Sequence, residues 1–392
     1  MRTPKILLIL LLFCSCSTHK KVTLPASVQK LNNVHAYPLN AEPSHKIAFK
    51  KDATYGDTNK VLIGNIRSLA VSSMGRVFLG NPDKGFFFVY APDGHYLTKL
   101  GGKGKGPGEF LYFSNPVILN HKLYARDPSQ RRINIFSTDS LALVRTLNVG
   151  IANRDTINAL QGYGVHSVYP RGNGTFLVQF TPKNIRKMGL VKLHQKYYYM
   201  NSKGKVLSHQ IFEQKGIGHG LLLAHIGGQL RGGSFRFVPH SLFALGSNHH
   251  IFTAWSSRFL IKEYNPDGAY QQAIYYPFNK VRLTRKQAMN LQKQRGNSKY
   301  YQQVLQHNSI PKTWPALHSM MIDDQNRLWI STIVKNMKVY QWWVLSPKGK
   351  LLARFKWPRS KPIKKVKNGY IYTLEKNNKG VKRVVRYKIQ MQ

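Results

Sequence analysis

One phrase recurs six times along the chain, and it constrains the fold more than any other feature. Each copy has a short apolar strand, a Gly or Asn turn, a second apolar strand, an aromatic-rich third strand, another turn and a fourth strand. The clearest copy runs from Ile66 to Leu100, with Gly75 and Gly94 in its turns. A four-stranded unit of this kind cannot bury both faces alone, so the copies must stack around an axis. The repeat predicts an all-β fold, a six-bladed β-propeller.

The other copies follow at intervals of about 45 residues, with wider intervals before the fourth and fifth. They begin near Pro116, Asn173, Leu242, Met320 and Ile363. The second wide interval predicts a helix from Thr284 to His307, with Thr284 as N-cap and a break near Gly296. We therefore expect a short helical insertion before the fifth blade, on one face. The chain ends in a strand, so the apolar and aromatic stretch 33–49 is expected to complete the last blade.

The first 16 residues are typical of an export signal. A basic start is followed by an apolar run from Ile6 to Phe13, which is too short to span a bilayer. The segment resembles a bacterial lipoprotein signal, in which a small residue precedes the cysteine that receives the lipid. Cys16 follows a serine and fits this pattern better than Cys14, which follows a phenylalanine. Lipidation is predicted at Cys16, and an ordinary signal peptide is the alternative.

The predicted organisation is a signal peptide at 1–16, a tether at 17–30 and the propeller at 31–392. A lipid at Cys16 would hold the protein at the outer membrane. Residues 17–21 lack the acid-rich signal associated with surface export, which favours a position facing the periplasm over the cell surface. Both cysteines of the chain lie in the first 16 residues, so the propeller has no disulfide, thiolate metal site or cysteine nucleophile.

Two segments resemble a known group of proteins. The glycine-rich stretch Gly101–Phe110, between two blades, is similar to the joining loop of six-bladed propeller lipoproteins of Bacteroidetes, a group related to NHL-repeat and TolB-like propellers. The stretch Asp323–Ile330 is similar to the same group, and the resemblance covers residues 17–392. It implies the fold but little about activity, because propellers serve as binding modules and as enzymes. The chain differs from the group in its charge and in turns that carry Asn, Lys or His instead of Asp.

Positive charge is the strongest peculiarity of the composition. Sixty Lys and Arg residues against 15 Asp and Glu give a formal charge of +45. Hydrophobic residues make up 42% of the chain, too many for a disordered polycation. The scarcity of carboxylates disfavours calcium binding and a glycosidase pair. A basic field attracts polyanions, more strongly at low salt, and basic residues are densest from Arg354 to Lys388.

This basic segment supplies the candidate polyanion-binding residues. They are Lys361, Lys364, Lys365, Lys367, Lys382, Arg383 and Arg386. The expected partners are lipopolysaccharide phosphates, anionic glycans or the membrane surface. Nucleic acid is not expected, because an exported lipoprotein rarely meets it and no nucleic-acid motif is present. The alternative is a basic composition without function, since the charge is spread over all blades.

Several motifs have structural interpretations. The glycine-rich stretch lacks the strand-before and helix-after context of a phosphate loop, so it predicts a blade junction with Phe110 packed between sheets. Asp323 and Asp324 lead into a turn, where Asp bonds nearby backbone. Aromatic runs in the third strands are expected to pack between blades. Three tryptophans nearer to loops are candidate platforms for sugar rings: Trp255, Trp314 and Trp357.

Histidines offer a different possibility. NHL-like lyases hold zinc with histidines that project into the tunnel, and His166, His240 and His318 lie near the starts of predicted inner strands. Their spacing defines no ligand set, so no metal and no cofactor are predicted. The predicted function is a monomeric, lipid-anchored binding or scaffold module for an anionic glycan, lipopolysaccharide or a protein partner. The alternative is a lyase or hydrolase with a site in the central tunnel.

Overall fold

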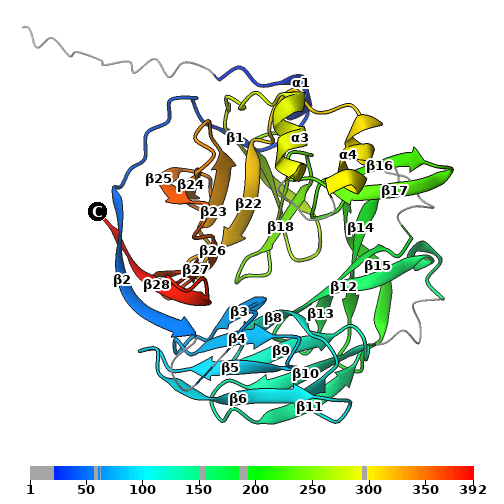
Figure 1. Ribbon diagram of the computed structural model, residues 1–392, viewed down its shortest axis with the longest axis vertical. Helices are drawn as coiled ribbons and strands as arrows, with labels where there is room; N and C mark the ends of the chain where they lie inside the picture. Colours follow the sequence, from blue (N-terminus) through cyan, green and yellow to red (C-terminus); the bar gives the residue numbers. More distant parts are fainter. Residues whose placement is uncertain (1–21, 57–60, 62, 150–155, 185–192, 294–297) are drawn as a thin grey trace, which may run out of the picture.

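The computed structural model describes residues 22–56, 61, 63–149, 156–184, 193–293 and 298–392. In this part of the chain six sheets stand around a common axis, as Figure 1 shows. Their boundaries follow the sequence repeat, and the innermost strand is the first strand of each blade. The chain is a six-bladed β-propeller, and the predicted fold class is confirmed.

The first three blades are built from consecutive strands. Blade one contains β3 (Ser68–Val71), β4 (Val77–Asn81), β5 (Phe86–Tyr90), β6 (Tyr96–Lys103) and the short β7 (Glu109–Phe110). Blade two contains β8 (Ser114–Leu119), β9 (Lys122–Asp127), β10 (Arg132–Ser137) and β11 (Leu143–Asn148). Blade three contains β12 (Tyr163–Pro170), β13 (Phe176–Pro182), β14 (His194–Met200) and β15 (Val206–Lys215), after the short 3-10 helix η1 (Asn158–Leu160).

Of the last three blades, the fourth and the sixth each include a strand from the N-terminal segment. Blade four contains β18 (Ser241–Leu245), β19 (Ile251–Trp255), β20 (Leu260–Tyr264), β21 (Tyr270–Tyr275) and β1 (Val34–Ala36). Blade five contains β22 (Leu317–Ile322), β23 (Leu328–Ile333), β24 (Val339–Leu345) and β25 (Leu351–Pro358). Blade six contains β26 (Ile363–Lys367), β27 (Tyr370–Lys376), β28 (Lys382–Met391) and β2 (Ile47–Gly56).

The ring is closed by the first long strand of the chain. β2 pairs antiparallel with β28, and Figure 1 shows the two ribbons together at the edge of blade six. The sequence predicts this closing strand at 33–49, but only Ile47 to Phe49 of that stretch belong to it. The reason is Tyr55, which is fully buried near the end of β2 and anchors the strand in the core. The earlier strand β1 lies parallel to β21 in blade four instead.

Part of the predicted tether also contacts the propeller. Residues 26–29 form the short helix α1 (Ala26–Gln29), and its Val28 is completely buried. The side chain of Ser27 accepts a hydrogen bond from Arg258 of blade four. The signal peptide and Cys16 lie outside the described residues.

Aromatic side chains fill the spaces between neighbouring blades, as the third strands predict. Phe87 and Trp343 are at most 4% exposed. Phe110, from the glycine-rich stretch, is completely buried and packs beside Phe87 and Phe113. The blade-junction interpretation of that stretch is therefore correct, and Arg132 fixes the junction by donating to the carbonyl oxygen of Gly106 at 2.6 Å.

The Asp pair of blade five is structural, as its place before a turn predicts. Oδ1 of Asp323 accepts the backbone N–H of Arg327 at 2.9 Å. Its Oδ2 accepts the indole N–H of Trp329 at 2.8 Å, and Trp329 is fully buried. Asp324 accepts the backbone N–H of Asn368 in the next blade at 3.1 Å.

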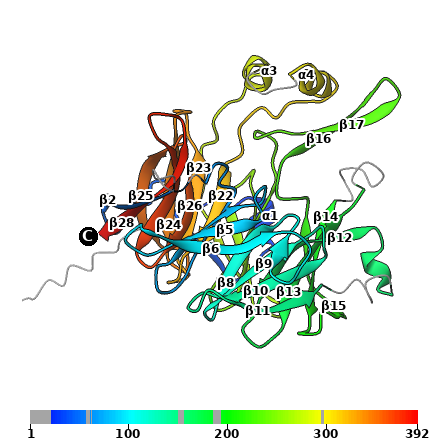
Figure 2. The ribbon, with the colours of Figure 1, turned by 60° about the horizontal axis from the view of Figure 1, so that its bottom comes forward.

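The two wide intervals of the repeat together form a cap on one end of the propeller. The first holds the hairpin β16 (Leu221–Ile226) and β17 (Gln229–Ser234), and the second holds α3 (Arg285–Lys293) and α4 (Ser298–Gln306). Figure 2 shows both standing off the same end of the ring. Their apolar side chains share one cluster, which includes Leu222, Phe235, Val304 and Trp314. The predicted helical insertion is confirmed, and the hairpin is its unpredicted partner.

The cap is joined by local hydrogen bonds. Thr284 is the N-cap of α3, since its Oγ1 accepts the backbone N–H of Gln287 at 3.2 Å. The phenol of Tyr300 on α4 donates to the carbonyl oxygen of Gly232 on the hairpin at 2.9 Å. The predicted break near Gly296 lies outside the described residues. No helix in the described ranges is long and apolar enough to cross a membrane.

Candidate functional site

The capped end of the propeller carries the starts of the inner strands, and basic side chains gather around them. They come from blades two to six and from the segments on either side of the cap hairpin. Burial, followed by the charge of a neighbouring member, lowers the pKa values of His166, His219, His318 and Arg359. We call this set the basic mouth. It consists of Arg126, His166, His219, Arg236, His240, His318, Arg359 and Lys364.

His318 lies at the centre of the basic mouth. It is the second residue of inner strand β22, and its ring stacks on Tyr340 with centroids 4.2 Å apart and planes 11° apart. The guanidinium of Arg359 lies 4.2 Å from the centroid of the same tyrosine ring. Burial, followed by the charges of other members of the mouth, lowers the pKa of His318 to about 4. The imidazole is therefore uncharged at neutral pH although cations surround it.

Arg359 reaches the mouth from the connection between blades five and six. Its Nε donates to the carbonyl oxygen of Val339 at 3.0 Å. Its Nη2 is buried and has no hydrogen-bond partner within the described ranges. Burial lowers the pKa of Arg359, and the nearby Arg236 lowers it too. A guanidinium N–H without an acceptor, beside a second cation, is a group that a bound anion would satisfy.

Three further imidazoles continue the mouth toward blade three. His240 lies directly before β18, and its backbone N–H donates to Oγ of Ser256 at 2.9 Å. Burial lowers the pKa of His240, and it also lowers those of His219 and His166. His240 adds to the effect on His219, and Arg126 adds to the effect on His166. Each imidazole is thus biased toward its neutral form.

Arg126, near the end of β9, links blade two to blade three. Its Nη1 donates to the carbonyl oxygen of His166 at 3.0 Å, and its Nη2 to that of Val165 at 2.8 Å. Burial lowers its pKa to about 10, so the guanidinium remains charged at neutral pH. Its Nε is buried without a partner in the part of the chain that the structure describes.

Nearby acids are engaged in structural interactions. Asp127, next to Arg126, accepts the backbone N–H groups of Leu111 and Ser129, both at 2.8 Å. Glu375 of blade six accepts the phenol of Tyr387 at 2.8 Å. These bonds hold a turn and a strand pair, and they leave the charge of the mouth available to an anion from outside.

The zinc arrangement considered for the tunnel histidines is not formed. Among the described residues, no three His, Cys, Asp or Glu side chains lie close enough together to hold a metal ion. His240 lies near His318, since its charge adds to the effect of burial in lowering the pKa of His318.

The seven candidate polyanion-binding residues lie on or beside the strands of blade six. Lys364 is exposed at the mouth. Lys382 donates to Oδ1 of Asn65 at 3.2 Å. Lys365 and Lys367 lie farther along β26, where burial, followed by the charge of Lys367, lowers the pKa of Lys365.

The other three candidates take part in holding blade six together. Lys361 lies 3.2 Å from a carboxylate oxygen of Glu375. Arg386 is 8% exposed and is paired with Asp52 on the closing strand. The side chain of Arg383 packs against Gly56 at the end of the same strand. Neighbouring residues of a strand point to opposite faces, so the basic side chains of this segment are divided between the two faces of the sheet.

Sequence reasoning named several members of the mouth, among them His166, His318 and Lys364. It missed Arg126, Arg236 and Arg359. A signal was present for two of them. Arg236 and Arg359 lie a few residues before an inner strand of the repeat, the same place that His240 occupies. Arg126 offered no signal, because its side chain reaches the mouth from the second strand of a blade.

These features define a class, a six-bladed propeller with a cap and a cluster of basic residues at its capped end. The family described as DUF5128, 6-bladed beta-propeller, matches residues 57–218, which include blades one to three and amount to less than half of the chain. No curated protein matches the chain.

Solved structures share the fold at low identity. A member of the DUF4221 family from Bacteroides vulgatus ATCC 8482 is 8% identical with a TM-score of 0.51, over 88% of this chain and 98% of that chain. A candidate exported protein from Bacteroides fragilis NCTC 9343 is 9% identical with a TM-score of 0.48, over 92% of this chain and 100% of that chain. Virginiamycin B lyase from Staphylococcus aureus is 9% identical with a TM-score of 0.39, over 88% of this chain and 99% of that chain. At such identities the similarity concerns the fold alone.

Proposed function

We propose that this protein is a binding module of the cell envelope that holds an anionic polymer, lipopolysaccharide or an acidic glycan, at the basic mouth. The observation that carries the proposal is Arg359, whose buried Nη2 has no partner among the described residues. Arg236 and Lys364 lie within electrostatic reach of the same His318 ring. A phosphate or carboxylate at this position would accept hydrogen bonds and relieve the repulsion between the cations.

Binding of an anion should also take up protons. The pKa of His318 is low because burial and the neighbouring cations disfavour its charged form. A negative ligand beside the ring would offset the effect of the neighbouring cations and would therefore raise the pKa of His318. By linkage, the affinity for the anion is expected to increase as the pH falls from 7 toward 5.

The test compares a double variant of the mouth, Arg236→Gln with Lys364→Gln, with the wild type on purified lipopolysaccharide over a range of salt. Both residues are exposed, so the fold should be retained. We expect about tenfold weaker binding at low salt and a flatter salt dependence. The matched control is Lys50→Gln with Lys356→Gln, two exposed lysines outside the mouth. Equal losses in both double variants, or no binding by the wild type at low salt, contradict the proposal.

We place the protein on the periplasmic side of the outer membrane through a lipid at Cys16, in the lipoprotein group of NHL-like and TolB-like propellers. The support is the sequence of residues 1–21, which lie outside the described residues. Cys16→Ala should leave an unlipidated precursor, whereas Cys14→Ala should be labelled by a fatty acid like the wild type. Normal labelling of Cys16→Ala would show that the anchor is elsewhere.

A second candidate is an enzyme, a lyase or hydrolase, that acts at the mouth. It is favoured by the uncharged state of the His318 ring beside Arg359, since a neutral imidazole accepts a proton while a cation neutralises the substrate's negative group. Incubation with acidic glycans and envelope peptides, followed by mass spectrometry, separates the two functions. Products that disappear in His318→Gln identify an enzyme, and intact ligands identify a binding module.

A further inference from the structure

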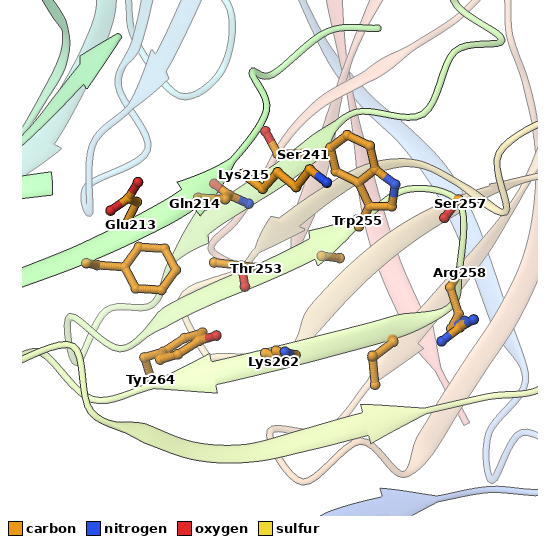
Figure 3. A pocket seen from close by; sticks show the side chains of 13 residues that line it. Glu213, Gln214, Lys215, Ser241, Thr253, Trp255, Ser257, Arg258, Lys262 and Tyr264 are labelled. Atoms are coloured by element: carbon orange, nitrogen blue, oxygen red, sulfur yellow. The ribbon is translucent and has the colours of Figure 1, made fainter. Parts of the chain in front are cut away.

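A groove between blades three and four lies beside the basic mouth. Its volume is about 530 Å³, and it is formed by β15 on one side and by β19 and β20 on the other. Figure 3 shows the side chains that line it. It borders the mouth because Ser241, one of the lining residues, directly follows His240. The binding proposed above does not use this groove.

Trp255, the last residue of β19, gives the groove an exposed aromatic surface. Its side chain is 41% exposed, whereas Trp314 is 6% exposed in the cap. Trp357 is partly buried, and its Nε1 donates to the carbonyl oxygen of Lys361 at 2.6 Å. Of the three tryptophans singled out from the sequence, Trp255 alone therefore offers an open ring.

Gly216 positions the Trp255 indole. Its φ is +77°, a conformation that other residues rarely adopt, and a Cβ at this position would lie 2.7 Å from Cζ3 of Trp255. The absence of a side chain thus lets the ring pack on the backbone. A platform that is already ordered loses little entropy when a ligand stacks on it.

Polar and charged groups lie on the same face of blade four as the indole. Thr253 and Trp255 are two residues apart on β19 and share a face of the sheet. Lys262 pairs directly opposite Thr253 on β20, and Tyr264 follows on the same side. In Figure 3, these side chains and Ser257 all face the groove. The lining combines an aromatic surface, hydroxyl groups and an ammonium group.

The groove also carries positive charge. Lys215 and Lys262 line it, and neither has an acidic partner within 4.0 Å in the part of the chain that the structure describes. The acid in the lining, Glu213, is engaged by the ring of His194 and by Nε2 of Gln210 at 3.2 Å. The two ammonium groups are therefore available to a negatively charged ligand.

We propose that the groove binds a sugar ring that carries a carboxylate, such as a uronic acid residue of an acidic polysaccharide. The C–H face of the ring packs on Trp255, as apolar surfaces do on aromatic rings. The hydroxyl groups at its edge hydrogen-bond to Ser257, and the carboxylate pairs with Lys262 or Lys215. The volume lies within the range of small-ligand sites. This site uses side chains that are separate from the basic mouth, so it stands independently of the function proposed there.

The experiment titrates the full chain with trigalacturonate and with neutral galactotriose, followed by calorimetry and tryptophan fluorescence. We expect trigalacturonate to bind and Trp255→Ala to weaken it at least tenfold, while Trp255→Tyr keeps most of the affinity because it keeps an aromatic face. Lys262→Gln should lower the affinity for trigalacturonate about tenfold and leave the affinity for galactotriose nearly unchanged. Tyr112→Ala, which removes another exposed aromatic ring, should match the wild type.

Three outcomes would overturn the assignment. Wild-type affinity in Trp255→Ala would exclude the stacking surface, and equal binding of both trisaccharides would exclude the charge recognition. A loss of trigalacturonate binding in Arg236→Gln, with Trp255→Ala unaffected, would place the sugar at the basic mouth. Circular dichroism of each variant confirms that the fold is retained.

Discussion

Blade six and the basic mouth use arginine in opposite ways. In blade six, Arg386 is 8% exposed, is paired with Asp52 of the closing strand and lies 4.3 Å from the centroid of the Tyr370 ring. At the mouth, Arg359 is partly buried, lies among other cations and leaves Nη2 without a partner among the described residues. The first arrangement holds the closing strand in its sheet. The second leaves a positive charge that has no acidic partner among the described residues.

The difference shows what a chain with few acids does with them. Fifteen Asp and Glu residues face 60 Lys and Arg residues. Asp52, Asp127 and Glu375 are used where strands or turns must be held together. The unmatched cations then gather at the basic mouth. A paired charge supports the structure, and an unpaired charge produces a field that acts on other molecules.

The largest expected effect comes from breaking the pair in blade six. Asp52→Asn leaves the buried guanidinium of Arg386 without its counter-ion, and we expect it to lower the free energy of unfolding by about 3 kcal/mol. Guanidinium chloride denaturation measures this. The control is Glu42→Gln, whose carboxylate is 80% exposed and lies 3.7 Å from Arg354; it should cost less than about 0.5 kcal/mol. Similar losses in both variants would mean that burial does not distinguish the pairs.

A smaller effect is expected from pH at the mouth. The ring of His318 faces these titratable or charged groups: His240, Arg359, Arg236, Lys364 and Tyr340. Its folded pKa of about 4 lies below the ordinary histidine value, so between roughly pH 6.5 and 4 the unfolded chain binds a proton that the folded chain does not. Stability should therefore fall as the pH falls through this window, by about 2 kcal/mol between pH 7 and 5.

His318→Gln tests this pH dependence, because glutamine has no titrating group. Thermal unfolding at several pH values should show a shallower loss of stability in the variant than in the wild type. His45→Gln, at an exposed position outside the mouth, should follow the wild-type curve. A variant curve parallel to that of the wild type would show that other groups cause the acid sensitivity.

The smallest effect is expected from removing a single cation of the basic mouth. Arg236→Gln removes one unmatched cation from the mouth, so it should stabilise the fold by about 0.5 kcal/mol at low salt. The gain should disappear in concentrated salt, which screens the repulsion. Denaturation of the variant and the wild type at two salt concentrations measures this. Destabilisation at low salt would show that Arg236 has a structural partner.

The role of a residue could be predicted from the sequence where its interaction partners lie close to it in the chain. Asp323 could be assigned to a turn because Arg327 and Trp329, which it bonds, follow within the same repeat unit. The blade junction at Phe110 and the N-cap at Thr284 were predictable for the same reason. The fold followed from the repeat, since each copy contains nearly all the strands of one blade.

The basic mouth could not be found in this way. Its members extend from Arg126 to Lys364 and come together only when the ring closes. The run of lysines on β26 does not itself say which side chains reach the mouth, because a strand distributes neighbouring side chains between two faces. Lys364 is exposed at the mouth, whereas Lys365 is partly buried. Repeats predict architecture, but a site shared by several repeats depends on their closure.

The two parts of the cap share one apolar core, which links them in evolution. The hairpin β16–β17 and the helices α3 and α4 enter from two different connections, yet each covers the apolar side chains of the other. Loss of the helices would expose Phe235 to water, and loss of the hairpin would expose Val304. A protein with only one of the two insertions is therefore disfavoured. The two insertions are therefore expected to be inherited as a pair, so that a related propeller has both or has neither.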